Sequence, residues 1–365
     1  MKNMRTTFFI GLALALCIAL PALAREESKT LSRIAVIGAS MSDGFGVRVS
    51  TTLPDGKKIS EGVNFAELVK TSCKDPSVVV VNYTSSLYFM NPARIAKSSA
   101  ARACGANAQE MPTCVLAVDW LFWNGYGTSN MKGEKLSTDQ ERMELLDNAL
   151  ACLEPFCAAN IPVVLGDFPD MHSAIGGGMI SAPMVPSVEC LAALNKRVAQ
   201  WALTKKNVCV VPLAQLTQDL LQKTTIHAAG REWDAKTLGP MLQKDRLHPT
   251  FAGTVTVLAA TLDALNTKTD NAALKSFEID PAVLRERFVT QLKASATKTD
   301  DVVPATPLAK PESSIPVMSP PKSETPPPSD SPSPTKPSAT SNSQTPSTPP
   351  EQPTPIPQMS LLTTP

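Results

Sequence analysis

Residues 34–46 read Ile34-Ala35-Val36-Ile37-Gly38-Ala39-Ser40-Met41-Ser42-Asp43-Gly44-Phe45-Gly46. The apolar run at the start is typical of a strand buried on both faces. Small residues and two glycines follow, so the strand should run into a turn with Ser40 at its tip. In open α/β folds, ligands bind beyond the carboxyl ends of the strands, and Ser40 lies just past such an end.

Apolar runs and helical stretches alternate from there to about residue 266. The expected strands are Arg33–Gly38, Ser77–Asn82, Thr113–Val118, Ile161–Gly166 and Asn207–Pro212. The expected helices are Asn64–Ser72, Asn91–Arg102, Thr138–Ala159 and Ser187–Lys205. This alternation predicts an α/β fold, a three-layer sandwich with a five-stranded parallel sheet, over residues 25–268.

The chain after residue 268 is expected to form two further parts. Residues 269–300 should be a helical extension, whose last helix begins with Asp280 as its cap and Pro281 in its first turn. Residues 301–365 hold 19 of the 33 prolines, with Ser and Thr between them. Proline lacks an N–H donor and the segment lacks core-forming residues, which predicts a disordered tail. It is either a spacer or a contact with the cell envelope.

The first 24 residues are typical of a cleavable export signal. Lys2 and Arg5 precede an apolar run, Phe8 to Leu20, and Ala22-Leu23-Ala24 fits a small-x-small cleavage site. The apolar run is short for a membrane span, although an uncleaved anchor is the alternative. The expected location is therefore secreted or periplasmic.

Charge and cysteine content narrow the class of protein. Loss of Lys2 and Arg5 with the signal changes the net charge from +1 to −1, and no basic stripe is visible. Nucleic acid is therefore excluded as the main partner. Seven cysteines remain after cleavage, for which we expect mostly buried thiols with one or two disulfides. No C-x-x-C pair or histidine cluster indicates zinc, so no metal and no cofactor are expected.

A second polar segment, Asp245-Arg246-Leu247-His248-Pro249-Thr250, lies near the end of the predicted domain. A carboxylate three residues before a histidine can hold the imidazole in the tautomer that a general base requires. Ser40, His248 and Asp245 are then the parts of a hydrolytic triad, provided that the fold brings them together. The structural alternative is a capping aspartate beside a partly buried histidine.

These two segments resemble conserved blocks of the SGNH (GDSL-like) hydrolases. Gly38-Ala39-Ser40-x-x-x-Gly44 resembles the first block, with alanine where aspartate is commonest, and Asp245-x-x-His248-Pro249 resembles the last. The resemblance spans roughly Leu31 to Leu265. It includes the run Asn195…Trp201-Ala202…Asn207-Val208…Val211-Pro212-Leu213, which is similar to the family's fourth helix and fifth strand.

The resemblance implies a flavodoxin-like fold and metal-free hydrolysis of ester-type bonds. It implies that Ser40 is the nucleophile, His248 the general base and acid, and Asp245 its orienting partner. The implied substrate is a small-molecule, glycan or lipid ester. We also expect the turn after the first strand to lie near a helix N-terminus, where backbone N–H groups can stabilise an oxyanion.

The middle blocks of the family do not match. No glycine follows the second strand, where Asn82-Tyr83-Thr84-Ser85-Ser86 stands, and Asp119 occupies the tip of the third strand. Asn124 lies three residues later than direct alignment with the family's asparagine requires. The candidates for oxyanion or substrate contacts are Asn124, Asp119, Ser85 and Gly44, together with the N–H of Ser40. Trp120, Phe122 and Trp123 could line an acyl or sugar pocket or belong to the core.

The sequence thus supports two main hypotheses from different classes. The first is an exported esterase that forms an acyl-enzyme on Ser40. The second is a non-catalytic protein on a degenerate SGNH fold that binds a glycan or another envelope component. A third, a flavodoxin-like domain that binds a phosphate ligand at Ser40–Gly46, leaves Asp245 and His248 unexplained.

Overall fold

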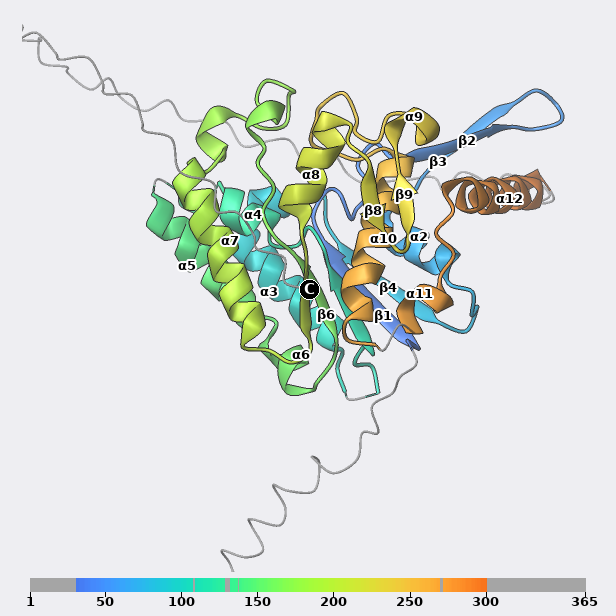
Figure 1. The fold of residues 1–365 in the computed structure, drawn as a ribbon. Coiled ribbons are helices and arrows are strands. Elements are labelled where there is room, and N and C mark those ends of the chain that lie inside the picture. The colour runs from blue at the N-terminus through green and yellow to red at the C-terminus, as the bar shows by residue number, and fades with distance from the viewer. Residues whose placement is uncertain (1–30, 108, 129–131, 137, 270–271, 301–365) are drawn as a thin grey trace, which may run out of the picture. The chain divides into compact units, whose positions relative to one another are not determined.

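The computed structural model describes residues 31–107, 109–128, 132–136, 138–269 and 272–300. The predicted export signal and proline-rich tail lie outside these residues. The described chain folds around a five-stranded parallel sheet, β4-β1-β5-β6-β7, which has helices on both faces (Figure 1). The prediction of a three-layer α/β sandwich is therefore confirmed. The second expected strand lies outside the first, which is the strand order of a flavodoxin-like sheet.

The elements have the following bounds. The strands are β1 Arg33–Gly38, β2 Arg48–Thr52, β3 Lys58–Gly62, β4 Val79–Thr84, β5 Cys114–Ala117, β6 Val163–Gly166, β7 Val208–Val211, β8 Ile226–Ala228 and β9 Arg231–Trp233. The helices are α2 Phe65–Ser72, α3 Pro92–Cys104, α4 Phe122–Tyr126, α5 Asp139–Ala151, α6 Glu154–Ala158, α7 Val188–Leu203, α8 Leu213–Gln222, α9 Ala235–Leu238, α10 Phe251–Asn266, α11 Ala272–Ser276 and α12 Pro281–Asp300. Short 3-10 turns occur at Tyr88–Met90, His172–Ala174 and Ala182–Met184.

Strand β1 is the centre of two hydrophobic cores because successive side chains of a strand point to opposite faces. Ile34 and Val36 pack with α2, α8 and α10 on one face, in a cluster that includes Leu68, Leu216 and Leu258. Ala35 and Ile37 pack on the other face, with α3, α5 and α7. These four side chains of β1 are each at most 2% exposed, so the strand is firmly packed and fixes the position of the turn that follows.

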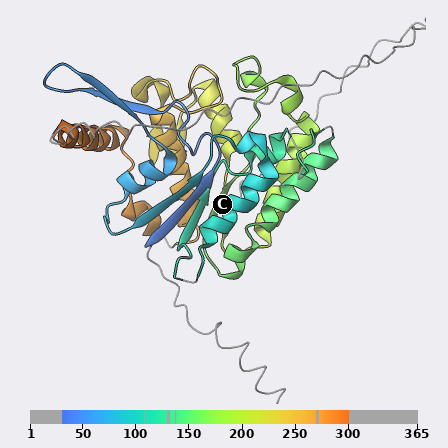
Figure 2. The same ribbon diagram turned by 180° about the vertical axis from the view of Figure 1, so that it is seen from behind.

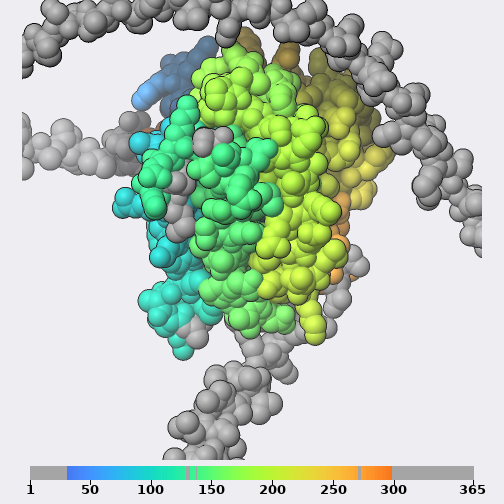
Figure 3. Space-filling view, turned by 90° about the vertical axis from the view of Figure 1, so that its left-hand side faces the viewer, coloured from blue at the N-terminus to red at the C-terminus, as the bar shows by residue number. Residues whose placement is uncertain are grey.

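The two helical layers enclose the sheet. Figure 2 shows the arrangement from behind, with α3 and α5 on one face of the sheet and α2 on the other. Figure 3 shows the outer surface of the α5 and α7 layer as a continuous packed face. No helix in the described ranges is long and apolar enough to span a membrane.

The structure corrects two predicted boundaries. The strand expected at Ser77–Asn82 begins two residues later, because Asp75 Oδ1 accepts hydrogen bonds from Ser77 N–H and Oγ in a turn before it. The helix expected over 138–159 is two helices, because Pro155 has no N–H to donate to the preceding turn and lies instead in the first turn of α6. Thr138 caps α5 in a capping box with Glu141.

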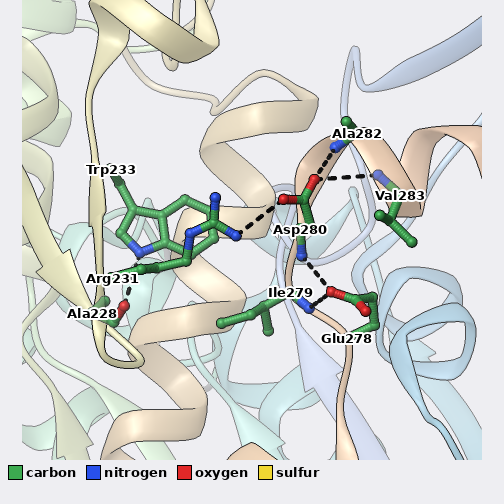
Figure 4. Close-up of polar contacts among 8 residues, drawn as sticks. All are labelled: Ala228, Arg231, Trp233, Glu278, Ile279, Asp280, Ala282 and Val283. Atoms are coloured by element: carbon green, nitrogen blue, oxygen red, sulfur yellow. Dashed lines mark hydrogen bonds and ion pairs between the residues drawn. The ribbon is translucent and has the colours of Figure 1, made fainter.

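Two hairpins were not predicted. Figures 1 and 2 show β2–β3 extending from the sandwich beside α12. In the second hairpin, β8–β9, Arg231 lies over the Trp233 ring and reaches Asp280 at 3.4 Å (Figure 4). Asp280 also accepts hydrogen bonds from the N–H groups of Ala282 and Val283. Asp280 therefore caps α12, as expected, and joins that helix to the β8–β9 hairpin.

Helix α12 packs on the domain. Arg287 donates to the carbonyl of Thr71 on α2 at 2.9 Å, and the Phe288 ring lies 5.9 Å from that of Phe251 on α10. The expected helical extension is thus part of the same compact unit as the sandwich.

The expectation of one or two disulfides is wrong for the described residues. All seven cysteines that remain after residue 24 are free thiols. Cys114 is buried in the core on the α10 face of the sheet, whereas Cys104 packs against the core on the α3 face, so the sheet separates them. The expectation of buried thiols is correct for Cys114, Cys190 and Cys209.

A buried arginine joins three segments of the α3–α7 layer. Arg142 is 7% exposed and donates to the carbonyls of Gly125, Met184 and Pro183 at 2.8, 3.2 and 3.2 Å. Hydrogen bonds from a charged donor to buried carbonyls are stronger than neutral ones. Arg142 therefore fixes α4, which directly follows the tip of β5, to α5 and to the loop before α7.

We predict that Arg142→Ala lowers the free energy of unfolding by about 2 kcal/mol, because the buried carbonyl of Gly125 and two part-buried carbonyls lose a charged donor. Urea-induced unfolding measures this change. Arg94→Ala on the exposed face of α3 is the matched control, with an expected change below about 0.5 kcal/mol. Equal losses in the two variants would contradict the role assigned to Arg142.

Candidate active site

Ser40 lies in a tight turn two residues beyond the end of β1. The N–H of Asp43 donates to the carbonyl of Ala39 at 2.8 Å, and that of Phe45 donates to the carbonyl of Ser40 at 3.0 Å. The chain then enters β2 rather than continuing as a helix. The expectation of a helix N-terminus at this point is therefore wrong, since only a single turn forms.

The carboxylate of Asp119 holds this turn in place. Its Oδ1 accepts the N–H of Ala39 at 3.0 Å and the hydroxyl of Ser42 at 2.5 Å, and its Oδ2 accepts the N–H of Ser42 at 3.1 Å. Gly38 makes this approach possible, because a Cβ there would lie 2.4 Å from Oδ1 of Asp119. The residues on both sides of Ser40 are thus fixed to the tip of β5.

A second carboxylate joins the turn to the loop after β4. Asp43 accepts hydrogen bonds from the hydroxyl of Thr84 at 2.7 Å and from the N–H of Ser86 at 2.9 Å, and its second oxygen also accepts the Ser86 hydroxyl. Strands β4 and β5 flank β1 in the sheet, so both of its neighbours hold the turn that carries Ser40.

His248 lies in a short loop that the chain closes just before α10. The N–H of Gln243 donates to the carbonyl of His248 at 2.8 Å, and Arg246 adopts a left-handed conformation, φ +56°, between them. The Gln243 side-chain amide donates to the carbonyls of Phe45 and Pro249 at 2.7 and 2.9 Å. One side chain thus joins the loop that carries Ser40 to the loop that carries His248.

The fold brings the three predicted catalytic residues into one hydrogen-bonded chain. His248 Nε2 lies 2.8 Å from Ser40 Oγ, and His248 Nδ1 lies 2.7 Å from Oδ2 of Asp245. The other carboxylate oxygen, Oδ1, accepts the N–H groups of Leu247 and His248 at 3.0 and 3.1 Å. The carboxylate therefore fixes both the backbone and the ring of the histidine.

The surroundings favour a charged aspartate beside a shielded imidazole. His248 is 1% exposed, and the Phe45 ring lies 4.5 Å from its ring, centroid to centroid. Burial by itself would raise the pKa of Asp245. The hydrogen bonds from His248 and from the N–H of Leu247 outweigh this effect, so the pKa lies below its usual range. Asp245 is thus ionised at neutral pH.

Two of the predicted contact residues have their N–H groups engaged elsewhere. The N–H of Ser85 donates to the carbonyl of Gly38 at 3.0 Å, and the Ser85 hydroxyl accepts the N–H of Leu87. The N–H of Gly44 donates to the carbonyl of Met41 at 3.1 Å. Gly44 has φ +76°, and a Cβ there would lie 2.2 Å from the Val63 carbonyl oxygen. Its place in the turn is therefore conformational.

Asn124 lies behind the site. It is fully buried on α4, and its Oδ1 accepts the hydroxyl of Tyr88 at 3.1 Å. Its Nδ2 has no hydrogen-bond partner among the described residues. Burial raises the pKa of Tyr88. Asn124 is absent from the walls of the pocket that contains Ser40 and His248.

Two backbone donors remain in the turn. The N–H groups of Ser40 and Met41 form no hydrogen bond with any residue that the structure describes. Both flank the Ser40 side chain and so are available to a group bound above it.

An apolar pocket opens beside Ser40 and His248. It encloses about 540 Å³, including the part that is open to solvent. Its other walls come from Met41, Asp119, Phe122, Pro169, Met171, Leu213, Leu216, Thr217, Leu220, Leu242, Leu247, Pro249 and Val257. Of the three predicted aromatic residues, only Phe122 lines it, whereas Trp120 and Trp123 belong to the core.

The pocket wall that sequence reasoning missed is α8. Leu213, Leu216 and Leu220 follow the last strand at helical spacing, which is the signal that could have revealed it. Asp167 at the end of β6 accepts the N–H of Ala214 at 2.7 Å and so fixes the start of this helix. Phe45 and Gln243, which contact the site, carry no sequence signal of their own.

The described residues hold no group of three or more His, Cys, Asp and Glu side chains placed to bind a metal ion. His172, after β6, is half-exposed and pairs with Asp170, Nδ1 to Oδ1 at 2.6 Å. His227 is exposed on β8. Neither histidine lines the pocket beside Ser40.

No protein-family model matches the sequence, and no curated protein matches it significantly. Several solved structures have a similar chain path. One is an acetylxylan esterase from Geobacillus stearothermophilus, at 18% identity and a TM-score of 0.39, which covers 64% of this chain and 94% of its own.

Two other similar structures come from Bacteroides. A GDSL-like lipase from Bacteroides thetaiotaomicron has 15% identity and a TM-score of 0.35, and covers 71% of this chain and 97% of its own. A putative acylhydrolase from Bacteroides fragilis has 14% identity and a TM-score of 0.37, and covers 70% of this chain and 94% of its own. At these values the likeness carries no argument about activity, which has to rest on the geometry of the site.

The two carboxylates of the site should make opposite contributions to the pH dependence of stability. Burial raises the pKa of Asp119, because the hydrogen bonds from Ser42 and Ala39 offset only part of the desolvation. Folded Asp119 therefore binds its proton more tightly than the unfolded chain does, and its contribution to stability falls as pH rises toward the folded pKa. Asp245 has a lowered pKa, so its contribution is present above the unfolded pKa and is lost as pH falls through the folded pKa.

We predict that the difference in free energy of unfolding, wild type minus Asp119→Asn, is larger near pH 4 than near pH 8. For Asp245→Asn the same difference should stay constant above about pH 5 and shrink below about pH 4. Urea unfolding across this range measures both. Parallel pH profiles for the two variants would show that the assigned charge states are wrong.

Proposed function

We propose that this protein is an exported serine hydrolase that cleaves an ester bond through an acyl-enzyme on Ser40. The observation that carries the proposal is the continuous chain from Asp245 through His248 to Ser40, with distances of 2.7 and 2.8 Å. This is the arrangement that activates a hydroxyl as a nucleophile. The apolar pocket beside it offers a place for the acyl group.

The residues of this chain account for both halves of the reaction. Ser40 Oγ attacks the ester carbonyl carbon while its proton passes to His248 Nε2, which gives a tetrahedral oxyanion. The oxyanion collapses, the C–O bond to the alcohol breaks, and His248 returns the proton to the leaving alcohol. Water then attacks the acyl-enzyme with His248 again as base, which releases the acid and restores the Ser40 hydroxyl. Asp245 remains ionised throughout and holds Nδ1–H.

The free N–H groups of Ser40 and Met41 are the proposed oxyanion donors. They flank the nucleophile and are not used within the described structure. Donors aimed at the developing charge act without reorganisation, which is the main source of rate in such sites. The Asp119 carboxylate accepts hydrogen bonds and donates none to the oxyanion. Its role in the proposed reaction is to hold the turn that presents the N–H groups of Ser40 and Met41.

Export is supported by the signal-like pattern of residues 1–24. An exported esterase would meet esters of the cell envelope or of the medium, which are the proposed substrates.

We predict that a fluorophosphonate probe labels the wild-type protein and leaves Ser40→Ala unlabelled. His248→Gln should be labelled at least about a hundredfold more slowly, because its serine lacks a base. Ser50→Ala, at an exposed serine of β2, is the matched control and should react like the wild type. In-gel fluorescence measures all four proteins.

The same probe tests export when it is applied to cell fractions. The labelled band is expected outside the cytoplasm, with Arg25 as its first residue. Labelling that persists in Ser40→Ala would refute the assigned nucleophile. A folded protein that is not labelled at all would favour the glycan-binding alternative.

We further predict that Asn124→Ala lowers kcat by less than about tenfold, because Asn124 is buried and does not line the pocket. Tyr88→Phe removes the same Tyr88–Asn124 hydrogen bond from the other side and should cause a similar small loss. Steady-state hydrolysis of an activated ester measures both. A loss of about a hundredfold or more in Asn124→Ala alone would identify Asn124 as an oxyanion donor instead.

A further inference from the structure

One face of α8 forms a continuous apolar wall of the pocket. Leu213, Leu216, Thr217 and Leu220 line it, at helix positions i, i+3, i+4 and i+7, which lie on one side of a helix. Figure 1 shows α8 beside α10 at one end of the sheet. Val257 of α10 and Leu242 and Leu247 of the His248 loop face the same space.

The chemistry of the walls restricts what can fill the pocket. Among the described residues, its polar lining residues apart from Ser40 and His248 are Asp119 and the half-buried Thr217. In the part of the chain that the structure describes, no lysine, arginine, asparagine or glutamine lines the pocket to bind the hydroxyls of a sugar or a second carboxylate. The pocket lies directly beside Ser40 and His248, which is where the acyl group of a bound ester would lie in the proposed reaction. A hydrocarbon group is the occupant that suits these walls.

The length of the α8 wall indicates how long a hydrocarbon group can lie along it. The seven-residue interval from Leu213 to Leu220 extends about 10 Å along the helix axis, at about 1.5 Å per residue. A saturated chain with single bonds of about 1.5 Å advances about 1.25 Å per carbon when extended. The wall therefore matches a chain of about eight carbons.

We propose that the acyl group of the substrate is an unbranched aliphatic chain of about eight carbons, bound along α8 between Leu213 and Leu220. The inference rests on the proposed esterase activity and specifies its substrate class, a medium-chain fatty acyl ester. Each methylene that leaves water for these walls favours binding, so an acetyl group would leave most of the pocket without contacts.

The test is hydrolysis of p-nitrophenyl acetate, butyrate, octanoate and dodecanoate by the full chain. We expect kcat/KM for octanoate to exceed that for acetate by at least about tenfold, with a lower value for dodecanoate. If none of the four esters is hydrolysed, the proposed function fails. If acetate is the best substrate, the function stands and the acyl-chain inference is overturned.

Variants of α8 locate the chain in the pocket. Leu216→Phe and Thr217→Trp add bulk halfway along the wall, and each should lower the octanoate-to-acetate ratio of kcat/KM by about tenfold or more. Thr217 lies outside the hydrophobic core, so its variant tests the same wall if Leu216→Phe does not fold. The ratio compares two substrates on one sample, which removes the effect of a partly unfolded preparation.

Gln218→Trp is the matched control, because Gln218 lies on the exposed face of the same helix. It should leave the ratio unchanged. An unchanged ratio in Thr217→Trp, or an equal fall in Gln218→Trp, would overturn the assignment of the acyl chain to this wall.

Discussion

The carboxylate of Asp119 is the contact on which the arrangement of the site depends. It extends from the tip of β5 and accepts hydrogen bonds from the residues on both sides of Ser40, at Ala39 and Ser42. A turn rich in small residues has few apolar side-chain contacts of its own, so its position depends on this acceptor together with Asp43, which joins it to the loop after β4. Burial of a carboxylate is costly unless donors surround it, and here the turn supplies them. The site and its support thus stabilise each other.

The layered fold was predictable because continuous apolar runs and helical spacing are local signals. All five strands of the sheet and helices α2, α3, α5 and α7 lie close to the ranges that the sequence pattern indicates, whereas α8 was not predicted. The β2–β3 hairpin was missed since its residues are mostly exposed and polar, and so carry no burial pattern. The disulfides were wrong because pairing depends on which face of the sheet a thiol occupies, and the spacing of Cys104 and Cys114 does not contain that information.

The site residues also fall into those that the sequence could indicate and those that depend on long-range contacts. Ser40, His248 and Asp245 could be proposed because their spacing reflects a chemical requirement, and the structure places them within hydrogen-bonding distance. The contacts proposed for Ser85 and Gly44 depended on which N–H groups remain free. Whether an N–H group is free depends on partners that are distant in the sequence, such as the Gly38 carbonyl that accepts the N–H of Ser85. A local sequence pattern does not contain that information. Asp119 lines the pocket beside Ser40, but its hydrogen bonds to the turn after β1 could not be foreseen.

The hydrogen bonds of Gln243 affect which parts of the site can be altered by substitution. Its amide fixes Phe45 and Pro249 to each other, and Gly46 leaves the space for it, since a Cβ there would lie 2.3 Å from Oε1. Ser40 and His248 are therefore held in place by the protein itself, and in the proposed reaction binding need not reorganise them. One wall of the proposed acyl pocket comes from α8, which takes no part in that assembly. Substitutions in α8 can accordingly alter which ester is accepted while the proton-transfer machinery remains preorganised.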